Sequence, residues 1–267
     1  MTISPDAQIH PSAVIGDGAV IGADCVIGPF CCLGSGVRLG ARTVLHPHVV
    51  ISGDTTVASD VTIHSFAVVG GTPQDKKFQG EASSLEIGPG TVIREHVTIN
   101  TGTAAGGGVT RIGANCLLMA GCHVAHDAQI ADRVVLVNQS AVAGHCVIGD
   151  DVIIGGLSGV HQHVRVGQGA IIGAVTMVSH DVIPHGLVQA PRGVLDGLNL
   201  IGLKRRGVGR KDITALRAAF HTLAQGDGSF QDRAERLGQD DDNVYVRQIV
   251  DFVTGASDRS YLTPGQP

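Results

Sequence analysis

Length, composition and charge exclude several classes of protein. The chain has 267 residues, of which 43% are hydrophobic, so it can bury a large core in one or two domains. Only 3% of the residues are aromatic whereas 38 are glycine, so small aliphatic side chains must fill that core. A net charge of -5 argues against a nucleic-acid-binding protein. The sequence has neither a basic, apolar leader nor a membrane-length apolar run, so we expect a cytoplasmic protein without stable membrane insertion.

An aliphatic residue recurs every six positions along most of the chain. The pattern runs from Ile9 to Val69, from Ile87 to Ile99 and from Ile112 to Val178. A period of six fits neither a helix nor a simple alternating strand, but it is typical of short strands joined by tight corners. Three such strands would close one coil of 18 residues, and about eight to nine coils would stack roughly 4.8 Å apart. We therefore predict a parallel β-helix, an all-β solenoid whose handedness the period does not give.

A second inward column lies two positions before each aliphatic residue, where the side chain is small or β-branched. Five of the six cysteines occupy it: Cys25, Cys31, Cys116, Cys122 and Cys146. We interpret these five as core residues rather than metal ligands or disulfide partners. Cys32 lies outside the column.

Glycine follows many of the aliphatic residues, as at Gly16, Gly22, Gly28, Gly34 and Gly40. Because glycine tolerates positive φ, we predict that these glycines form the left-handed corners of the coils.

The repeat is interrupted twice and ends near Pro184. We predict inserted loops near residues 71–86 and 101–110 of a β-helix that spans residues 1–190. Residues 191–267 are predicted to form an α-helical domain, because apolar residues from Ile213 to Leu223 and after Asn243 follow helical spacing. Ser229 with Asp232 has the pattern of a helix start. Such a tail usually caps one end of a solenoid.

Histidine and aspartate gather at one corner of the predicted coils. His126 lies two positions after an aliphatic residue, and His145 and His163 lie three positions after one, where side chains point outward. With coils of 18 residues, Asp127, His145, His163 and Asp181 form one column. Histidine moves protons readily near neutral pH, so the column indicates an active site. The alternative is a solvated polar edge, which the six histidines between positions 123 and 180 make less favoured.

Several motifs together resemble one enzyme family. They are the loop GGTPQDKKFQGE, the stretch HVAHD, the tripeptide AGH, the segment GGLSGVHQ and the run LNLIGLKRRG. Over residues 1 to about 225, the chain resembles the UDP-N-acetylglucosamine acyltransferases, the first enzymes of lipid A biosynthesis. The resemblance implies a left-handed parallel β-helix of hexapeptide repeats with a C-terminal α-helical domain. It also implies a homotrimer with active sites between subunits.

The resemblance also implies a reaction. A 3-hydroxyacyl chain would pass from acyl carrier protein to the glucosamine 3-hydroxyl of UDP-N-acetylglucosamine, with no metal and no dissociable cofactor. A sugar hydroxyl is a poor nucleophile at neutral pH, so His126 is the expected general base. Asp127 would favour its productive tautomer and stabilise the imidazolium. The backbone N–H of Gly144 would donate to the oxyanion of the tetrahedral intermediate.

Further residues are expected to bind the substrates, on the strength of the resemblance. Those expected around the sugar, the diphosphate and the acyl hydroxyl are His123, His145, His161, Asp75 and Lys77. Those expected to hold the uridine and the phosphates are Gln162, Asn199 and Arg205. Arg205 has a second interpretation, because residues 204–206 could form a solvated basic helix face instead of a site for a diphosphate or for acidic acyl carrier protein.

Three positions depart from the family pattern. Ile201 stands where a glutamate often contacts the ribose, so one nucleotide contact is absent or replaced. Ala174 stands where glycine often lets a long acyl chain extend, and Arg192 replaces a histidine near the same end of the channel. Because an added methyl group shortens the channel, we expect a preference for a shorter 3-hydroxyacyl chain than the longest that the family accepts.

Two other classes of function stay open at this point. A γ-class carbonic anhydrase is also a trimeric β-helix, and three histidines could hold its zinc, although it has no need of the basic helical tail. A non-catalytic repeat scaffold is the second alternative. The N-acyltransferase of the same pathway normally carries a uracil-binding domain before its hexads, for which the start of the repeat at Ile9 leaves no room.

Overall fold

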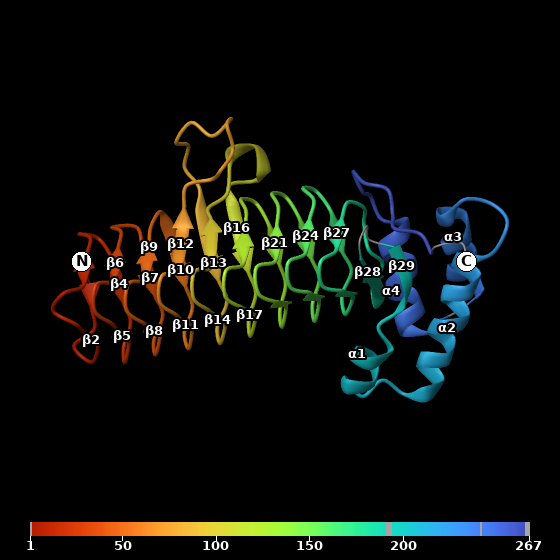
Figure 1. The fold of residues 1–267 in the computed structure, drawn as a ribbon, viewed down its shortest axis with the longest axis horizontal. Coiled ribbons are helices and arrows are strands. Elements are labelled where there is room, and N and C mark those ends of the chain that lie inside the picture. The colour runs from red at the N-terminus through yellow and green to blue at the C-terminus, as the bar shows by residue number, and fades with distance from the viewer. Residues whose placement is uncertain (1, 191–193, 241, 265–267) are drawn as a thin grey trace.

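The computed structural model describes residues 2–190, 194–240 and 242–264. Short strands wind into a three-sided prism, and helices lie at its C-terminal end (Figure 1). Each side of the prism is one sheet, and successive strands move from sheet A to sheet B to sheet C and back. None of the helices among the described residues is long and apolar enough to span a membrane.

The three sheets hold nine, eleven and nine strands. Sheet A consists of β1 (Thr2–Ile3), β4 (Val20–Ile21), β7 (Arg38–Leu39), β10 (Asp54–Val57), β13 (Ser84–Ile87), β16 (Val109–Ile112), β19 (Gln129–Ile130), β22 (Val147–Ile148) and β25 (Arg165–Val166). Sheet B consists of β2 (Gln8–Ile9), β5 (Val26–Ile27), β8 (Val44–Leu45), β11 (Thr62–Ile63), β14 (Val92–Ile93), β17 (Leu117–Leu118), β20 (Val135–Leu136), β23 (Ile153–Ile154), β26 (Ile171–Ile172), β28 (Gly186–Gln189) and β29 (Val194–Leu198). Sheet C consists of β3 (Val14–Ile15), β6 (Cys32–Leu33), β9 (Val50–Ile51), β12 (Val68–Gly71), β15 (Thr98–Asn100), β18 (His123–Val124), β21 (Ala141–Val142), β24 (Gly159–Val160) and β27 (Met177–Val178).

The register of the strands confirms the predicted coil of 18 residues. Ile9 pairs with Ile27, and Ile27 pairs with Leu45, all in parallel. The stack begins with β1, one strand before the first recognised hexad at Ile9.

The interior contains the two columns that the period predicts. The second residue of a strand is buried, as at Ile63, and so is the residue two positions before it, as at Val61. Cys25, Cys31, Cys116, Cys122 and Cys146 are all buried, whereas Cys32 is exposed. Burial raises the pKa of the Cys146 thiol to about 12, so this sulfur is an unreactive core atom.

The prediction for the corner glycines is wrong in its physical reason. Gly16, Gly22, Gly28, Gly34 and Gly40 are absent from the positive-φ residues, and the left-handed position falls two residues later, as at Asp24 and Arg42. At four of the five positions glycine is required because the next coil passes close by, whereas a Cβ on Gly34 would make an ordinary contact at 3.5 Å. A Cβ on Gly16 would lie 2.6 Å from the backbone nitrogen of Ser35, and one on Gly40 would lie 2.6 Å from the carbonyl carbon of Ala58.

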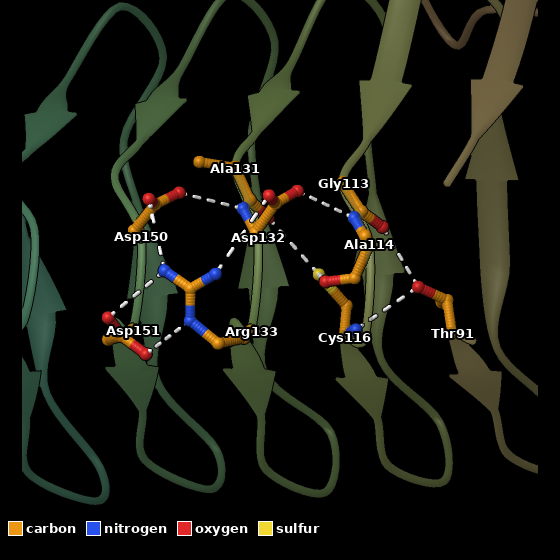
Figure 2. A network of polar contacts seen from close by, with 9 residues as sticks. All are labelled: Thr91, Gly113, Ala114, Cys116, Ala131, Asp132, Arg133, Asp150 and Asp151. Atoms are coloured by element: carbon orange, nitrogen blue, oxygen red, sulfur yellow. Dashed lines mark hydrogen bonds and ion pairs between the residues drawn. The ribbon is translucent and has the colours of Figure 1, made fainter. Parts of the chain in front are cut away.

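Polar side chains tie successive coils together along the edge between sheets A and B. Figure 2 shows Asp150 accepting a hydrogen bond from the backbone N–H of Asp132 at 2.9 Å, and Asp132 accepting one from Ala114 at 2.7 Å. Arg133 donates to Asp151 at 2.8 Å, and the hydrogen bond and nearby carboxylates raise the pKa of its guanidinium. This edge is a structural ladder along which each coil satisfies the polar groups of the next.

Two inserted loops leave the prism on the same side (Figure 1). The first lies between β12 and β13, and the second lies between β15 and β16 and contains the short 3-10 helix η1 (Ala104–Gly106). Both loops therefore start where sheet C passes into sheet A, close to the predicted positions. We call residues 101–108 the second loop.

In the C-terminal region, the described residues form β28, β29 and four helices: α1 (Leu200–Arg205), α2 (Arg210–Ala224), α3 (Phe230–Asp240) and α4 (Val244–Thr254). Strand β29 pairs antiparallel with β28, so sheet B continues past residue 190, where the helical region was expected to begin. The predicted helix starts are confirmed, because Ser229 and Asp232 exchange hydrogen bonds before α3 and Asn243 caps α4.

Candidate active site

The predicted catalytic residues lie in the turns between sheets C and A, on the edge that carries both loops. His126 and Asp127 connect β18 to β19, and Gly144 and His145 connect β21 to β22 one coil further on. Asp127, His145 and His163 have φ values of 61°, 61° and 64°, which place them in the left-handed region. Aspartate and histidine tolerate that conformation better than bulky side chains, so the sequence suits these corners.

His126 and Asp127 form a hydrogen-bonded pair. Nδ1 of His126 lies 2.8 Å from Oδ2 of Asp127, and the two side chains are 13% and 1% exposed. An ionised carboxylate can only accept, so Nδ1 carries the hydrogen and Nε2 is left with its lone pair. The pair therefore holds the tautomer that a general base requires.

The sequence predicted that Asp127 points into solvent, but this side chain is buried. The second loop covers it: the backbone N–H of Thr103 donates to Oδ1 at 2.8 Å and the hydroxyl of Thr103 donates to Oδ2 at 2.6 Å. Burial alone would raise the pKa of the Asp127 carboxyl, but the hydrogen bonds from Thr103 and His126 outweigh it and hold the pKa below its usual value. Sequence reasoning missed Thr103, because only the folded loop brings it to the dyad.

The predicted column is confirmed over three coils and then ends. The rings of His145 and His163 stack with centroids 4.5 Å apart, and Nδ1 of His145 lies 3.7 Å from Oδ2 of Asp127. Asp181 does not continue the column. It is fully buried, and it accepts from the backbone N–H and the guanidinium of Arg165, both at 2.7 Å. The reason is a shorter last coil, in which Val166 aligns with Val182.

Two further histidines of the site are partly desolvated. Burial lowers the pKa of His145, although the nearby Asp127 carboxylate opposes that shift. Burial also lowers the pKa of His123, with a contribution from His126, and Nδ1 of His123 lies 2.8 Å from the hydroxyl of Thr98. Both shifts favour the neutral imidazole, which can accept as well as donate hydrogen bonds.

Gly144 packs directly against the His126 ring. A Cβ at position 144 would lie 2.7 Å from Cε1 and 2.8 Å from Nε2 of His126, so only glycine fits here. Within the described parts of the chain, the N–H of Gly144 donates to no other group. A backbone donor is therefore unused beside the nitrogen that would take the proton.

The loop residues Asp75 and Lys77 lie toward the same edge. Oδ1 of Asp75 accepts from the backbone N–H of Lys77 at 2.9 Å, which fixes the turn. Asp75 is close enough to His145 for its charge to oppose the lowering of that imidazole's pKa. The first loop thus supplies a carboxylate to the surroundings of the dyad.

His161 and Gln162 are exposed near the C-terminal end of this edge. Nη2 of Arg259 lies 3.1 Å from Nδ1 of His161, so the C-terminal segment brings a cation to a predicted substrate contact. Sequence reasoning missed Arg259, which belongs to no recognised motif.

Asn199 and Arg205 do not lie on the edge that carries His126 and Asp127. With Ile201 they line a cavity of about 640 Å³ whose wall consists of outward residues of sheet B, including Val135 and Ile153. Asn199 also caps α1, because its Oδ1 accepts from Gly202 at 2.9 Å and its amide donates to Gly169. Sheet B is the side of the prism opposite the edge between sheets C and A, so one chain does not bring these residues to His126.

Two residues were expected to limit the acyl chain. Ala174 is exposed at the turn that precedes β27. Arg192 lies outside the described residues.

One group among the described residues has the spacing of metal ligands: His126, Asp127 and His145, whose candidate ligand atoms lie within 4.8 Å of one another. Both oxygens of Asp127 already accept hydrogen bonds from Thr103, and Oδ2 also receives one from His126. The group is thus already hydrogen-bonded as a dyad, and it fits a cation less well than a set of free ligand atoms would.

Comparison with known proteins decides the family. A model described as "Udp N-acetylglucosamine O-acyltransferase; Domain 2" matches residues 181–262, and a bacterial transferase hexapeptide model matches residues 1–35 and 109–144. The acyl-[acyl-carrier-protein]–UDP-N-acetylglucosamine O-acyltransferase of Paracoccus denitrificans is 57% identical over 199 residues, which are 74% of this chain and 76% of that protein. The chain belongs to the UDP-N-acetylglucosamine acyltransferase family.

Other members of this acyltransferase family support the assignment. The relative from Caulobacter vibrioides is 54% identical over 75% of this chain and 77% of its own length. The solved UDP-N-acetylglucosamine acyltransferase from Campylobacter jejuni superposes with a TM-score of 0.91 at 36% identity, covering 97% of this chain and all of that one. The left-handed parallel β-helix with a C-terminal helical region, expected from the resemblance, is confirmed.

Proposed function

We propose that this chain transfers a 3-hydroxyacyl group from an acyl carrier protein thioester to the glucosamine 3-hydroxyl of UDP-N-acetylglucosamine, the first step of lipid A biosynthesis. Membership of the acyltransferase family supports the reaction. The observation that carries the mechanism is the hydrogen-bonded pair of His126 and Asp127, with the unused N–H of Gly144 beside it.

The reaction proceeds by direct transfer. Nε2 of His126 removes the proton of the sugar hydroxyl as its oxygen attacks the thioester carbonyl, and Asp127 stabilises the imidazolium through Nδ1. The carbonyl oxygen becomes an oxyanion, to which the N–H of Gly144 donates. When the tetrahedral intermediate collapses, the carbon–sulfur bond breaks, and the departing thiolate takes the proton from His126. The products are the acylated sugar nucleotide and the free thiol of acyl carrier protein.

The remaining predicted residues bind the substrates in this proposal. Around the sugar, diphosphate and acyl hydroxyl it places His123, His145, His161, Asp75 and Lys77. For the uridine and phosphates it places Gln162, Asn199 and Arg205. The exposed Arg205 lines a cavity in this structure, which favours an anion-binding role over a merely solvated helix face.

The active form is a homotrimer in this proposal. The cavity near Asn199 and Arg205 lies over sheet B, whereas His126 lies on the opposite edge of the prism, so a complete site needs two chains. Mixed trimers test this point. An inactive His126→Ala chain and an inactive Arg205→Ala chain should regain part of the native turnover when they are unfolded and reassembled together. A mixture as inactive as either variant alone would contradict the shared site.

Ala174 sets the length of the acyl channel in this proposal, with Arg192 as the second residue predicted to limit that length.

The cytoplasmic location stays a prediction. The reaction needs no metal ion, so turnover should persist when a strong chelator is present.

The central experiment compares the native protein with His126→Ala. Each is incubated with UDP-N-acetylglucosamine and a series of 3-hydroxyacyl carrier proteins, and the acylated sugar nucleotide is measured. Loss of a general base lowers kcat by roughly 10²- to 10⁴-fold. His96→Ala is the matched control, because His96 occupies a corner with φ of 59° on the edge between sheets B and C. Full turnover by His126→Ala would refute the assignment of the base. If the native protein formed no product with any thioester, the reaction itself would be refuted.

A further inference from the structure

The second loop, residues 101–108, closes over the carboxylate of the proposed dyad. Its Thr103 is 3% exposed and Asp127 is also 3% exposed, so their contact is shielded from water. We propose that Thr103 is a positioning residue for the acyl transfer, whose N–H and hydroxyl hold the Asp127 carboxylate in the orientation that serves Nδ1 of His126. This inference rests on the proposed function of the dyad.

Each oxygen of the carboxylate is fixed by a different group of the same residue. The N–H of Thr103 donates to Oδ1 at 2.8 Å, and its hydroxyl donates to Oδ2 at 2.6 Å. The backbone N–H of Asp127 donates to the hydroxyl of Thr110 at 2.7 Å, which holds the turn. The two donors of Thr103 hold the carboxylate itself, with Oδ2 2.8 Å from Nδ1 of His126.

Gly106 shows how closely the loop approaches. A Cβ at this position would overlap the carboxylate of Asp127, so the loop closes this far only with glycine there. The fit also excludes water from the carboxylate, which would otherwise compete with Thr103 and His126 for its oxygens.

The second loop is itself anchored by the first. The hydroxyl of Ser83 donates to that of Thr101 at 3.0 Å, and the N–H of Ala104 donates to Glu81 at 3.3 Å. The backbone N–H of Ser84, the first residue of β13 directly after the first loop, donates to the carbonyl of Gly108 at 2.8 Å. Both insertions therefore act together to hold one threonine over the dyad.

The charged and titratable groups around Asp127 come from three elements. His126 is its partner in the same turn, and His145 faces it from the next coil. The first loop contributes Asp75, which acts on His145, and Glu81, which accepts from the second loop. Compared with these neighbours and with Thr110, Thr103 alone contacts both oxygens of the Asp127 carboxylate.

The chemical role of Thr103 predicts a change in pH dependence. Without the hydroxyl, the carboxylate loses a donor and binds a proton more readily. A carboxylate with one donor fewer accepts more strongly from Nδ1, so the dyad as a whole takes up its next proton, on Nε2 of His126, at a higher pH, and the base is lost there. The acid limb of the kcat/KM profile should then move to higher pH.

The test is Thr103→Val, which keeps the backbone N–H and the side-chain shape but removes the hydroxyl. We expect kcat to fall by about 10- to 100-fold and the acid limb to rise by about one pH unit, with KM for UDP-N-acetylglucosamine little changed. Thr103→Ser keeps the hydroxyl and should restore most of the native kcat and the native acid limb.

Thr101→Val is the matched control. Thr101 is 4% exposed in the same loop, but its hydroxyl accepts from Ser83 and does not contact Asp127. This variant should lose thermal stability without moving the acid limb. Gly106→Ala is a second, independent perturbation, because it displaces the loop while keeping Thr103, and it should move the acid limb in the same direction.

The outcomes separate the two proposals. Loss of product with the native protein would overturn the acyl transfer itself. The native protein could form product while Thr103→Val kept both the native kcat and the native acid limb. That result would overturn only the role of Thr103. A slow Thr103→Val that keeps the native acid limb would also overturn that role, because such a result describes a structural residue. If Thr103→Val does not fold, a native profile for Gly106→Ala overturns the proposal and a shifted one supports it.

Discussion

Replacing Asp127 by asparagine would keep the shape of the buried side chain and remove its charge. Oδ1 accepts from the backbone N–H of Thr103 at 2.8 Å, so the amide oxygen must occupy this position, because an amide nitrogen there would face another donor. The amide nitrogen then takes the place of Oδ2, 2.8 Å from Nδ1 of His126. It donates to Nδ1, the hydrogen of the imidazole moves to Nε2, and the ring can no longer accept the proton of the sugar.

The magnitude follows from the tautomer. The equivalent substitution in a Ser-His-Asp triad lowers kcat by about 10⁴, which corresponds to about 5 kcal/mol of transition-state stabilisation. Stability should change less. The amide oxygen still accepts from the N–H of Thr103, and the amide nitrogen donates to the hydroxyl of Thr103 and to Nδ1 of His126. These hydrogen bonds are neutral, and the loss of charge assistance costs about 1–2 kcal/mol. Activity should therefore fall much further than stability.

The assay measures acylated sugar nucleotide under single-turnover conditions, beside thermal unfolding of the same preparations. Asp132→Asn is a suitable control, because Asp132 accepts a backbone hydrogen bond from Ala114 at 2.7 Å through one oxygen, which an amide oxygen can replace. That variant should keep native turnover. If Asp127→Asn kept more than about a tenth of the native kcat, the tautomer argument would be refuted.

Three other substitutions test separate parts of the structure. Gly144→Ala places a Cβ 2.7 Å from Cε1 of His126, so kcat should fall by about 100-fold or more, and normal turnover would contradict the packing. Ala174→Gly should shift the preferred thioester toward longer acyl chains in a competition assay, and an unchanged preference would remove Ala174 from the channel. His185 is 2% exposed, and burial lowers its pKa below 6.5. His185 therefore binds a proton more readily in the unfolded chain than in the folded one. The stabilisation by neutral His185 is complete above pH 6.5 and is lost as the pH falls below that value. His185→Gln should flatten the fall in melting temperature between about pH 7 and pH 5.5, and an equal slope would refute this assignment.

The period of six residues was sufficient to predict the coils and the residues of their core. Each inward position repeats within its own six-residue unit, so a local pattern identifies Ile63 and Val61 as buried and separates Cys146 from Cys32. The corners were harder to predict. Gly16 follows an aliphatic residue as expected, but its role is to let the next coil pass at Ser35, which is a contact 19 residues away and not a local backbone preference.

The two aspartates of the predicted column show where local reasoning ends. Both were placed at the corners by counting, and both are buried by segments that counting does not include. The second loop covers Asp127, and the shortened last coil carries Asp181 onto Arg165, where Ser257 of the C-terminal segment also donates to it. A repeat gives the position of a residue in a coil, whereas insertions and caps decide its exposure.

The division of the predicted site between two faces has the same origin. The motifs of residues 123–163 and 199–205 were recognised together, but a motif carries no information about which side of the prism it reaches. In one chain the edge that carries His126 and the cavity that contains Arg205 are separated by the packed interior of the prism. The outward residues of sheet B beside that cavity are apolar, as at Val135, Ile153 and Ile171, which suits contact with another chain better than contact with water. In the proposed homotrimer, this apolar face of one chain lies beside the His126 edge of a neighbour, so that both chains contribute residues to one substrate site. The His126 edge and the Arg205 cavity are therefore two halves of one site only if copies of this chain assemble around it.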